Sequence, residues 1–132
     1  MRVQTRRWAA GMAAAAWMVI IFRLSALPGT AVPGRFGWLG HLLGYAVLAS
    51  LYLIALDPQV SSPRAAARAV VLASLYGITD EIHQLFVPGR SSDPVDWLVD
   101  TAGALMAVGL IAWIGRRAAR RSDSAGVPDT GH

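Results

Sequence analysis

Apolar residues along this chain are gathered into four long stretches separated by short polar segments. The stretches run over residues 8–27, 36–56, 65–87 and 95–115. Each is long enough to cross the hydrocarbon core of a bilayer, which takes about 20 helical residues. The segments between them carry helix-breaking Pro and Gly residues. The pattern therefore predicts an all-α membrane protein, a bundle of four transmembrane helices.

The positions of the arginines predict how these helices are oriented in the membrane. All 12 basic residues are arginine, and only Arg23, Arg35 and Arg90 fall on the side of the first and third connections. Because cytoplasmic loops of membrane proteins are enriched in basic residues, both termini are predicted to be cytoplasmic. The remaining arginines lie on that predicted cytoplasmic side: Arg2, Arg6, Arg7, Arg64, Arg68, Arg116, Arg117, Arg120 and Arg121.

Composition supports a membrane location. Hydrophobic residues make up 55% of the chain and the mean hydropathy is +0.44. A pI near 10.7 would also suit nucleic-acid binding, but the arginines lie between apolar runs instead of along one face. We therefore predict the lipid bilayer as a partner and no nucleic acid. Cysteine is absent, which excludes disulfides, a thiolate nucleophile and cysteine metal ligands.

Three parts are expected along the chain. Residues 1–7 form a cytoplasmic N-terminus, residues 8–115 the membrane domain, and residues 116–132 a basic and then disordered cytoplasmic tail. A basic start before an apolar run also fits a cleaved signal peptide. The even number of spans and the consistent arginine count favour the uncleaved chain, and the predicted location is a bacterial plasma membrane.

Small residues recur at four-residue spacing in every stretch, which allows membrane helices to approach closely. In a chain rich in alanine and glycine this supports a compact bundle only weakly. The pairs are Gly11 and Ala15, Gly40 and Gly44, Ala73 and Gly77, and Gly103 and Ala107.

The acidic, histidine and glutamine residues inside the predicted spans fall in one depth band. Such residues are costly within a membrane unless they are paired or used. At 1.5 Å of rise per residue, three helices place them in the outer half of the bilayer. Arg90 lies on the loop above them. The band consists of His41, Asp80, Glu81, His83, Gln84, Asp96 and Asp100.

Helical spacing predicts which of these side chains share a face. Residues three and four apart point together, so Asp80 aligns with His83 and Gln84. Asp96 aligns with Asp100 in the same way. His41 aligns with Tyr45 on the second helix. Facing inward, these groups would form a polar pocket below the Pro-Gly-Arg loop.

These residues resemble the VanZ-like family of small bacterial membrane proteins. The resemblance covers residues 17–115 and rests on His41-x-x-x-Tyr45, Asp80-Glu81-x-His83-Gln84, and Pro88-Gly89-Arg90 followed by Asp96 and Gly103. The family is named for a protein linked to teicoplanin resistance. Its members often carry Lys three residues before the histidine, where this chain has Trp38, and Asn where this chain has Asp100. The predicted pocket is therefore more acidic than the family pattern.

Several of these residues also have structural interpretations. Asp93, followed by Pro94, is predicted to cap the fourth helix. Asp100 has an equally good interpretation as half of a structural ion pair. Asp80 and His83 could bind a divalent metal, but di-iron bundles use two such motifs and this chain has one. We therefore predict no metal site, and the sequence identifies no cofactor.

Two classes of function fit this pattern. In the first, the protein binds or acts on a cell-envelope, lipid-linked or glycopeptide-related ligand. The predicted catalytic residues are then His41, Asp80, Glu81, His83 and Asp96, and the predicted ligand-binding residues are Tyr45, Gln84, Arg90 and Asp100. In the second, the protein is a small ion-coupled transporter. A membrane accessory module with a purely structural polar band is a further alternative, and whether a reaction is catalysed stays open.

Overall fold

The computed structural model describes residues 2–28 and 37–125, which fold into four α-helices. They are α1 (Arg2–Ser25), α2 (Gly37–Leu56), α3 (Pro63–Gln84) and α4 (Pro94–Ala125). The prediction of an all-helical chain with four helices is confirmed. Arg35, Phe36 and the expected tail from residue 126 onward lie outside the described residues.

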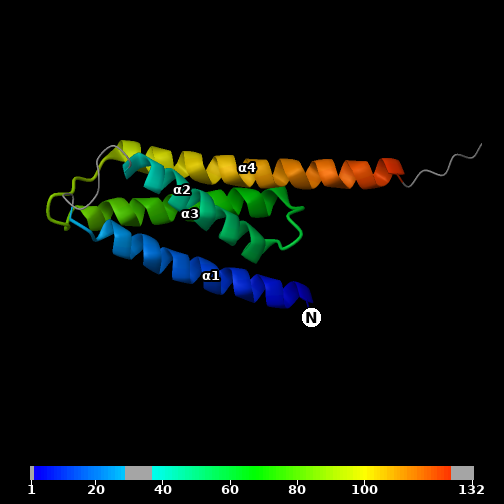
Figure 1. Cartoon of the computed structure of the whole chain (residues 1–132), viewed down its shortest axis with the longest axis horizontal. Coiled ribbons are helices and arrows are strands. Elements are labelled where there is room, and N and C mark those ends of the chain that lie inside the picture. The colour runs from blue at the N-terminus through cyan, green and yellow to red at the C-terminus, as the bar shows by residue number, and fades with distance from the viewer. Residues whose placement is uncertain (1, 29–36, 126–132) are drawn as a thin grey trace, which may run out of the picture.

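The helices run alternately up and down along the bundle (Figure 1). α2 occupies the middle of the bundle and packs against α1, α3 and α4, whereas α1 touches α3 only slightly. The start of α1 and the end of α4 lie at the same end of the bundle (Figure 1). The opposite end holds the α3–α4 loop.

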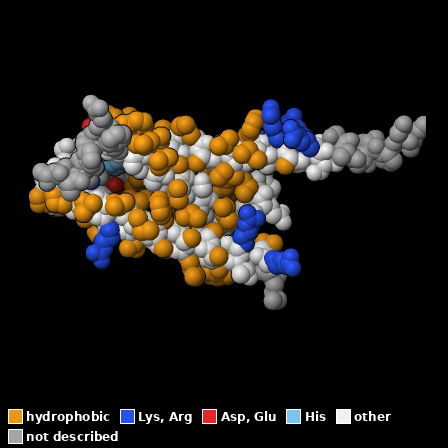
Figure 2. Space-filling model, in the orientation of Figure 1, with side chains coloured by type: hydrophobic (Ala, Val, Ile, Leu, Met, Phe, Trp, Pro, Cys, Tyr) orange, Lys and Arg blue, Asp and Glu red, His pale blue; other side chains and the backbone are white. Residues whose placement is uncertain are grey.

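Three of the four helices, α1, α2 and α4, are long and apolar enough to cross a membrane. Large hydrophobic side chains cover the face of the bundle shown in Figure 2, with arginines toward its ends. Both observations are consistent with a multi-pass membrane protein. α3 has 22 residues, about 33 Å of helix, but its charged residues place it below the hydropathy of a spanning segment.

α4 continues past residue 115, where the apolar stretch ends, to Ala125. Alanine and arginine are both strong helix formers, so the helix does not stop where hydrophobicity does. Arg117 lies over the Trp113 ring, 4.1 Å from its centroid, and covers the aromatic side chain at this end. The basic segment expected as the start of a tail is therefore part of α4.

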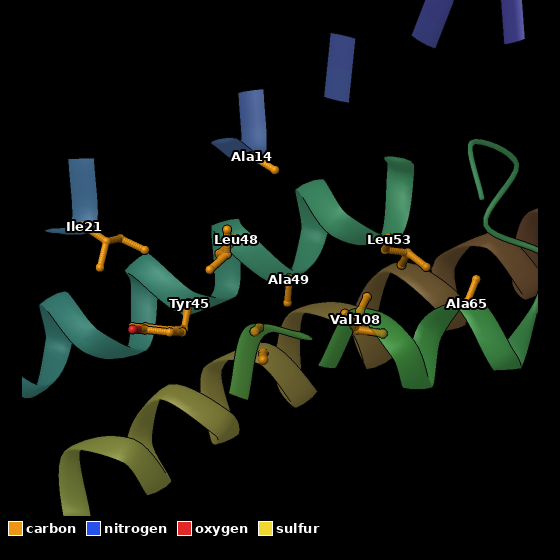
Figure 3. Close-up of a cluster of buried hydrophobic side chains, with 11 residues drawn as sticks. Ala14, Ile21, Tyr45, Leu48, Ala49, Leu53, Ala65 and Val108 are labelled. Atoms are coloured by element: carbon orange, nitrogen blue, oxygen red, sulfur yellow. The ribbon is translucent and has the colours of Figure 1, made fainter. Parts of the chain in front are cut away.

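Small side chains make up much of the bundle core (Figure 3). Ala65, Ala69 and Ala73 recur every four residues on the buried face of α3. α2 supplies larger side chains, including Leu48 and Leu53, which are completely buried. Small residues facing large ones let the helices approach closely, as expected for membrane helices that associate by packing.

The cap predicted at the start of α4 is confirmed. Oδ1 of Asp93 accepts a hydrogen bond from the backbone N–H of Val95, at 2.9 Å. Pro94 is the first residue of the helix, where its missing N–H costs nothing. Gly89 in the preceding loop has φ 72°, a conformation that glycine adopts without strain. These features fix the point at which α4 enters the bundle.

Candidate functional site

The buried polar side chains of the described residues are gathered at one end of the bundle. They are Ser25, Asp80, Glu81, Gln84 and Asp100. At this end α1 and α3 finish and α2 and α4 begin (Figure 1). The depth band expected from the sequence is therefore a spatial cluster. We call it the polar cluster, and it comprises His41, Asp80, Glu81, Gln84, Asp96 and Asp100.

His41 of α2 lies beside two carboxylates of α4. Its Nδ1 is 2.9 Å from Oδ1 of Asp100, and its Nε2 is 3.9 Å from Oδ2 of Asp96. The side chain of Asp100 is completely buried, whereas that of Asp96 is 29% exposed. The bond to Asp100 orients the imidazole ring and decides which nitrogen carries the proton. The other nitrogen faces the more accessible carboxylate.

Two buried glycines let α4 approach its neighbours at the polar cluster. A Cβ atom on Gly103 would overlap the backbone carbonyl of Leu42 on α2. A Cβ atom on Gly77 of α3 would lie 3.1 Å from Oδ2 of Asp100 and 3.3 Å from Cδ1 of Trp97. A larger residue at Gly103 would push α2 and α4 apart, and one at Gly77 would force the side chains of Asp100 and Trp97 to shift. These glycines therefore make room for the contact between His41 and Asp100.

Gln84 joins the polar cluster to α1. Its Nε2 donates to Oδ2 of Asp80 at 3.3 Å and to Oγ of Ser25 at 3.1 Å. Asp80 and Gln84 lie on one face of α3, as their four-residue spacing predicts. Ser25 is the last residue of α1, so this network fixes the end of α1 against α3.

Glu81 joins the polar cluster to the loop that precedes α4. Its Oε2 accepts hydrogen bonds from Oγ of Ser92 at 3.0 Å and from the backbone N–H of Asp93 at 2.8 Å. Glu81 is 7% exposed, and its other carboxylate oxygen has no hydrogen-bond partner in the described part of the chain. The loop is thus held from below by a buried carboxylate.

The remaining predicted site residues border the polar cluster. Tyr45 is buried one turn below His41, and its hydroxyl has no partner within the described ranges. His83 stacks on Phe22 of α1, with ring centroids 4.2 Å apart. Nε of Arg90 donates to the carbonyl oxygen of Leu27 at 3.2 Å. His83 and Arg90 therefore each contact the end of α1 or the residues just after it.

A groove of about 430 Å³ opens between α1 and α2 and reaches the polar cluster. Figure 2 shows acidic and histidine side chains in a recess at this end. The polar lining includes His41, Asp80, Gln84 and Arg90. The apolar lining comes from Trp17, Ile21, Leu24, Leu43 and Val47 together with the glycines Gly37, Gly40 and Gly44.

Two contributors to this site escaped sequence analysis. Ser25 is a polar residue at the end of an apolar run, and that position was the available signal. Gly77 is one of several small residues at four-residue spacing, and nothing in the sequence tells which of them faces a carboxylate. Trp38, which replaces the lysine frequent in the resembled family, is 53% exposed.

Comparison with protein families gives one match over most of the chain. The family model described as VanZ/LLP1 matches residues 10–115. The chain belongs to the VanZ/LLP1 family. Comparisons with curated proteins and with solved structures gave no match. The family domain ends inside α4 and contains the whole polar cluster, so the geometry described above is that of a VanZ-family domain.

Proposed function

We propose that this VanZ-family protein binds a lipid-linked or glycopeptide-related cell-envelope ligand near the outer face of the plasma membrane. The observation that carries the proposal is the groove. Its walls are apolar, and it reaches a histidine, an arginine and buried carboxylates. Such a surface suits an amphiphile, because an acyl or prenyl chain can lie along the walls while the polar head meets the cluster.

The arginines support the orientation in this proposal. They are concentrated at the end of the bundle where α1 begins and α4 ends, and few of those described lie at the other end (Figure 2). By the positive-inside rule this end is cytoplasmic. The polar cluster and the groove then lie at the extracytoplasmic side. α3 is the fourth span in this arrangement, because its acidic residues are buried against its neighbours and not exposed to lipid.

The polar cluster also has the components of acid–base chemistry. His41, oriented by Asp100, is suited to transfer a proton, and Asp80, Glu81, Asp96 and His83 lie on the adjoining helix turns. Arg90 is suited to hold a phosphate or carboxylate group of the ligand. Tyr45 and Gln84 would contact the ligand beside it. Conversion of a bound ligand, followed by mass spectrometry, separates a catalytic role from a binding role.

The apolar interior argues against an ion-coupled transporter. Apart from Ile21 and Tyr45, which lie beside the polar cluster, the buried side chains of the core are alanine, leucine and valine (Figure 3). Among the described residues, every buried ionisable side chain lies at the cluster end. A transporter needs polar groups along its pathway, whereas this arrangement provides a pocket that opens at one side.

Two glycine substitutions test the groove as a binding site. A Cβ atom meets nothing within 4 Å at Gly40, which lines the groove, or at Gly109 on α4, which does not. Gly40→Phe should therefore fill the groove without disturbing the helix, and Gly109→Phe is the matched control. In a bacterial host where the natural chain alters teicoplanin susceptibility, Gly40→Phe should abolish the effect and Gly109→Phe should retain it.

Binding to the purified protein provides the second measurement. The natural chain and the Gly109→Phe variant should bind teicoplanin or a polyprenyl diphosphate in detergent, and Gly40→Phe should not. Arg90→Gln should weaken binding of the diphosphate. Full retention of binding and phenotype by Gly40→Phe, at normal expression, would overturn the proposal.

A further inference from the structure

We propose that His41, Glu81 and Asp100 bind a divalent transition-metal ion of the Zn²⁺ class. Each residue offers one ligand atom, and these atoms all lie within 4.8 Å of one another. The three residues come from three different helices, α2, α3 and α4. The sequence-based expectation of no metal considered only Asp80 with His83, whereas the fold brings in a histidine from another helix.

The buried carboxylates share a pattern of hydrogen bonding that suits a metal. Each has one oxygen held by a donor, whereas the other oxygen has no partner in the described residues. For Asp80 the held oxygen accepts from Gln84, and for Glu81 it accepts from Ser92. For Asp100 it meets His41. Bonds of this kind orient metal ligands, while the free oxygen is left for the ion.

The unpartnered carboxylate oxygens belong to buried side chains. The exposed fractions of Asp80, Glu81 and Asp100 are 4%, 7% and 0%. Buried polar atoms nearly always have partners, because an unpaired one loses its interaction with water without compensation. Three carboxylate oxygens at one end of the bundle, unpartnered within the described residues, are therefore acceptors that a positive group would satisfy. A cation shared between Glu81 and Asp100 supplies it.

Charge balance leads to the same conclusion. Four carboxyl groups meet in the polar cluster, and in the described ranges both of their ion pairs involve His41. The side chain of Arg90 donates to a backbone carbonyl instead. Several carboxylates that share a low-dielectric site repel one another and lose hydration. A divalent ion offsets two of these charges at once.

The ligand set favours zinc over magnesium or calcium. Imidazole nitrogen with carboxylate oxygen is a usual zinc donor set, whereas magnesium and calcium take oxygen ligands. Zinc bonds of about 2.0–2.2 Å hold neighbouring ligand atoms about 3.4 Å apart in a tetrahedron. The present separations need only side-chain adjustment to reach this geometry. His41 and Asp80 also line the groove, so an ion here is reachable from it.

Zinc titration of the purified full-length chain tests this proposal. The protein is produced with a tag that lacks histidine, stripped with a chelator in detergent, and titrated with Zn²⁺ by calorimetry. We expect one ion per chain, confirmed by elemental analysis after gel filtration. Glu81→Gln and Asp100→Asn each remove a charged ligand at nearly constant shape. Each should weaken binding at least about tenfold.

Asp93→Asn is the matched control. Asp93 is close to Glu81 but caps α4, and asparagine retains the capping oxygen. This variant should bind Zn²⁺ like the natural chain. Zn²⁺ should also raise the unfolding temperature of the natural chain and of Asp93→Asn, but not that of the ligand variants. Circular dichroism checks that each variant is helical before titration.

Two results would overturn the metal site. One is equal Zn²⁺ affinity in the natural chain, Glu81→Gln and Asp100→Asn, which would place any bound ion elsewhere. The other is no stoichiometric binding by the helical natural chain. Neither result depends on an antibiotic or a lipid, so the metal proposal and the proposed ligand-binding function can fail separately.

Discussion

His41 and Asp100 meet where α2 packs against α4, with Nδ1 of the imidazole 2.9 Å from Oδ1 of the carboxylate. They are 59 positions apart in the chain. Asp100 is completely buried, and two glycines, Gly77 and Gly103, make room around it. This contact is therefore part of both the helix packing and the candidate site. Substitutions of Asp100 can separate its structural role from a functional one.

Replacing Asp100 distinguishes a structural role from a functional one. Asp100→Ala leaves the His41 ring nitrogen without its partner, and an unpaired buried polar group costs about 1–3 kcal/mol. Asp100→Asn keeps an acceptor oxygen at the same place and should unfold within a few degrees of the natural chain. Thermal unfolding in detergent, followed by circular dichroism, measures both. If Asp100→Asn is stable but loses the susceptibility phenotype, the carboxylate charge has a functional role. A stable variant with full phenotype would favour the accessory-module alternative.

Gly103 is predicted to be the glycine most sensitive to substitution. A Cβ atom there overlaps the Leu42 backbone, which cannot turn aside as a flexible side chain can. Gly103→Ala should therefore force α2 and α4 apart and lower stability by about 1–3 kcal/mol. Gly109→Ala is the control on the same helix, because its Cβ atom meets nothing within 4 Å. If Gly103→Ala lost less stability than Gly109→Ala in the same thermal unfolding assay, the result would contradict the close approach of α2 and α4.

Hydropathy predicted the four helices because each carries a long apolar stretch, and three of them are apolar enough to cross a membrane. It predicted their ends less well. α1 begins at Arg2 and α4 ends at Ala125, both beyond the apolar stretches. Hydropathy follows the thickness of the hydrocarbon core, whereas the helix continues as long as its residues favour helical backbone. Arginine does so at both of these ends, together with glutamine at the start of α1 and alanine at the end of α4.

The depth of the polar cluster could be predicted, but its contacts could not. Helical rise fixes how deep a residue lies, so His41 and Asp100 were expected at one level. Helix rotation and crossing angle decide which side chains meet. His83 stacks on Phe22 of α1, a partner that its spacing from Asp80 does not identify. Gly40 and Gly103 belong to identical small-residue patterns, but the first lines the groove and the second packs against a backbone.

Asp57 in the α2–α3 loop should make stability depend on pH. Backbone N–H groups of Ser62, Ser61 and Gln59 donate to its carboxylate, which holds the pKa of Asp57 below its usual 3.8. The ionised form is therefore favoured by folding. Its contribution is complete above about pH 5, where the carboxyl group of the unfolded chain is also ionised, and is lost as the pH falls through the lowered pKa.

Asp57→Asn tests this effect. The variant loses the charge that these donors bind, and we expect it to be less stable at neutral pH by about 1 kcal/mol. The difference from the natural chain should shrink when thermal unfolding is measured at acid pH, because the natural carboxylate is then protonated. A difference that is constant from neutral to acid pH would show that the loop hydrogen bonds do not depend on the charge.

Single-cysteine labelling tests the arrangement of the helices in the membrane. The natural chain has no cysteine and is an unlabelled control. Gln59, Ser91 and Ser122 are exposed and lie in the α2–α3 loop, in the α3–α4 loop and near the end of α4. With four spans and cytoplasmic termini, a membrane-impermeant maleimide should label Ser91→Cys in spheroplasts, and should label Gln59→Cys and Ser122→Cys only after lysis.

Labelling of the two loops decides whether α3, the least apolar helix, crosses the membrane. If α3 crosses the membrane, the Gln59→Cys and Ser91→Cys variants must label from opposite sides. If α3 only lies at the surface, both label from the same side, and Ser122→Cys labels from the side opposite to them. The first outcome is expected, because α3 buries Asp80 and Glu81 against neighbouring helices and is about 33 Å long. Labelling of both loops from the same side would show that α3 does not cross the membrane.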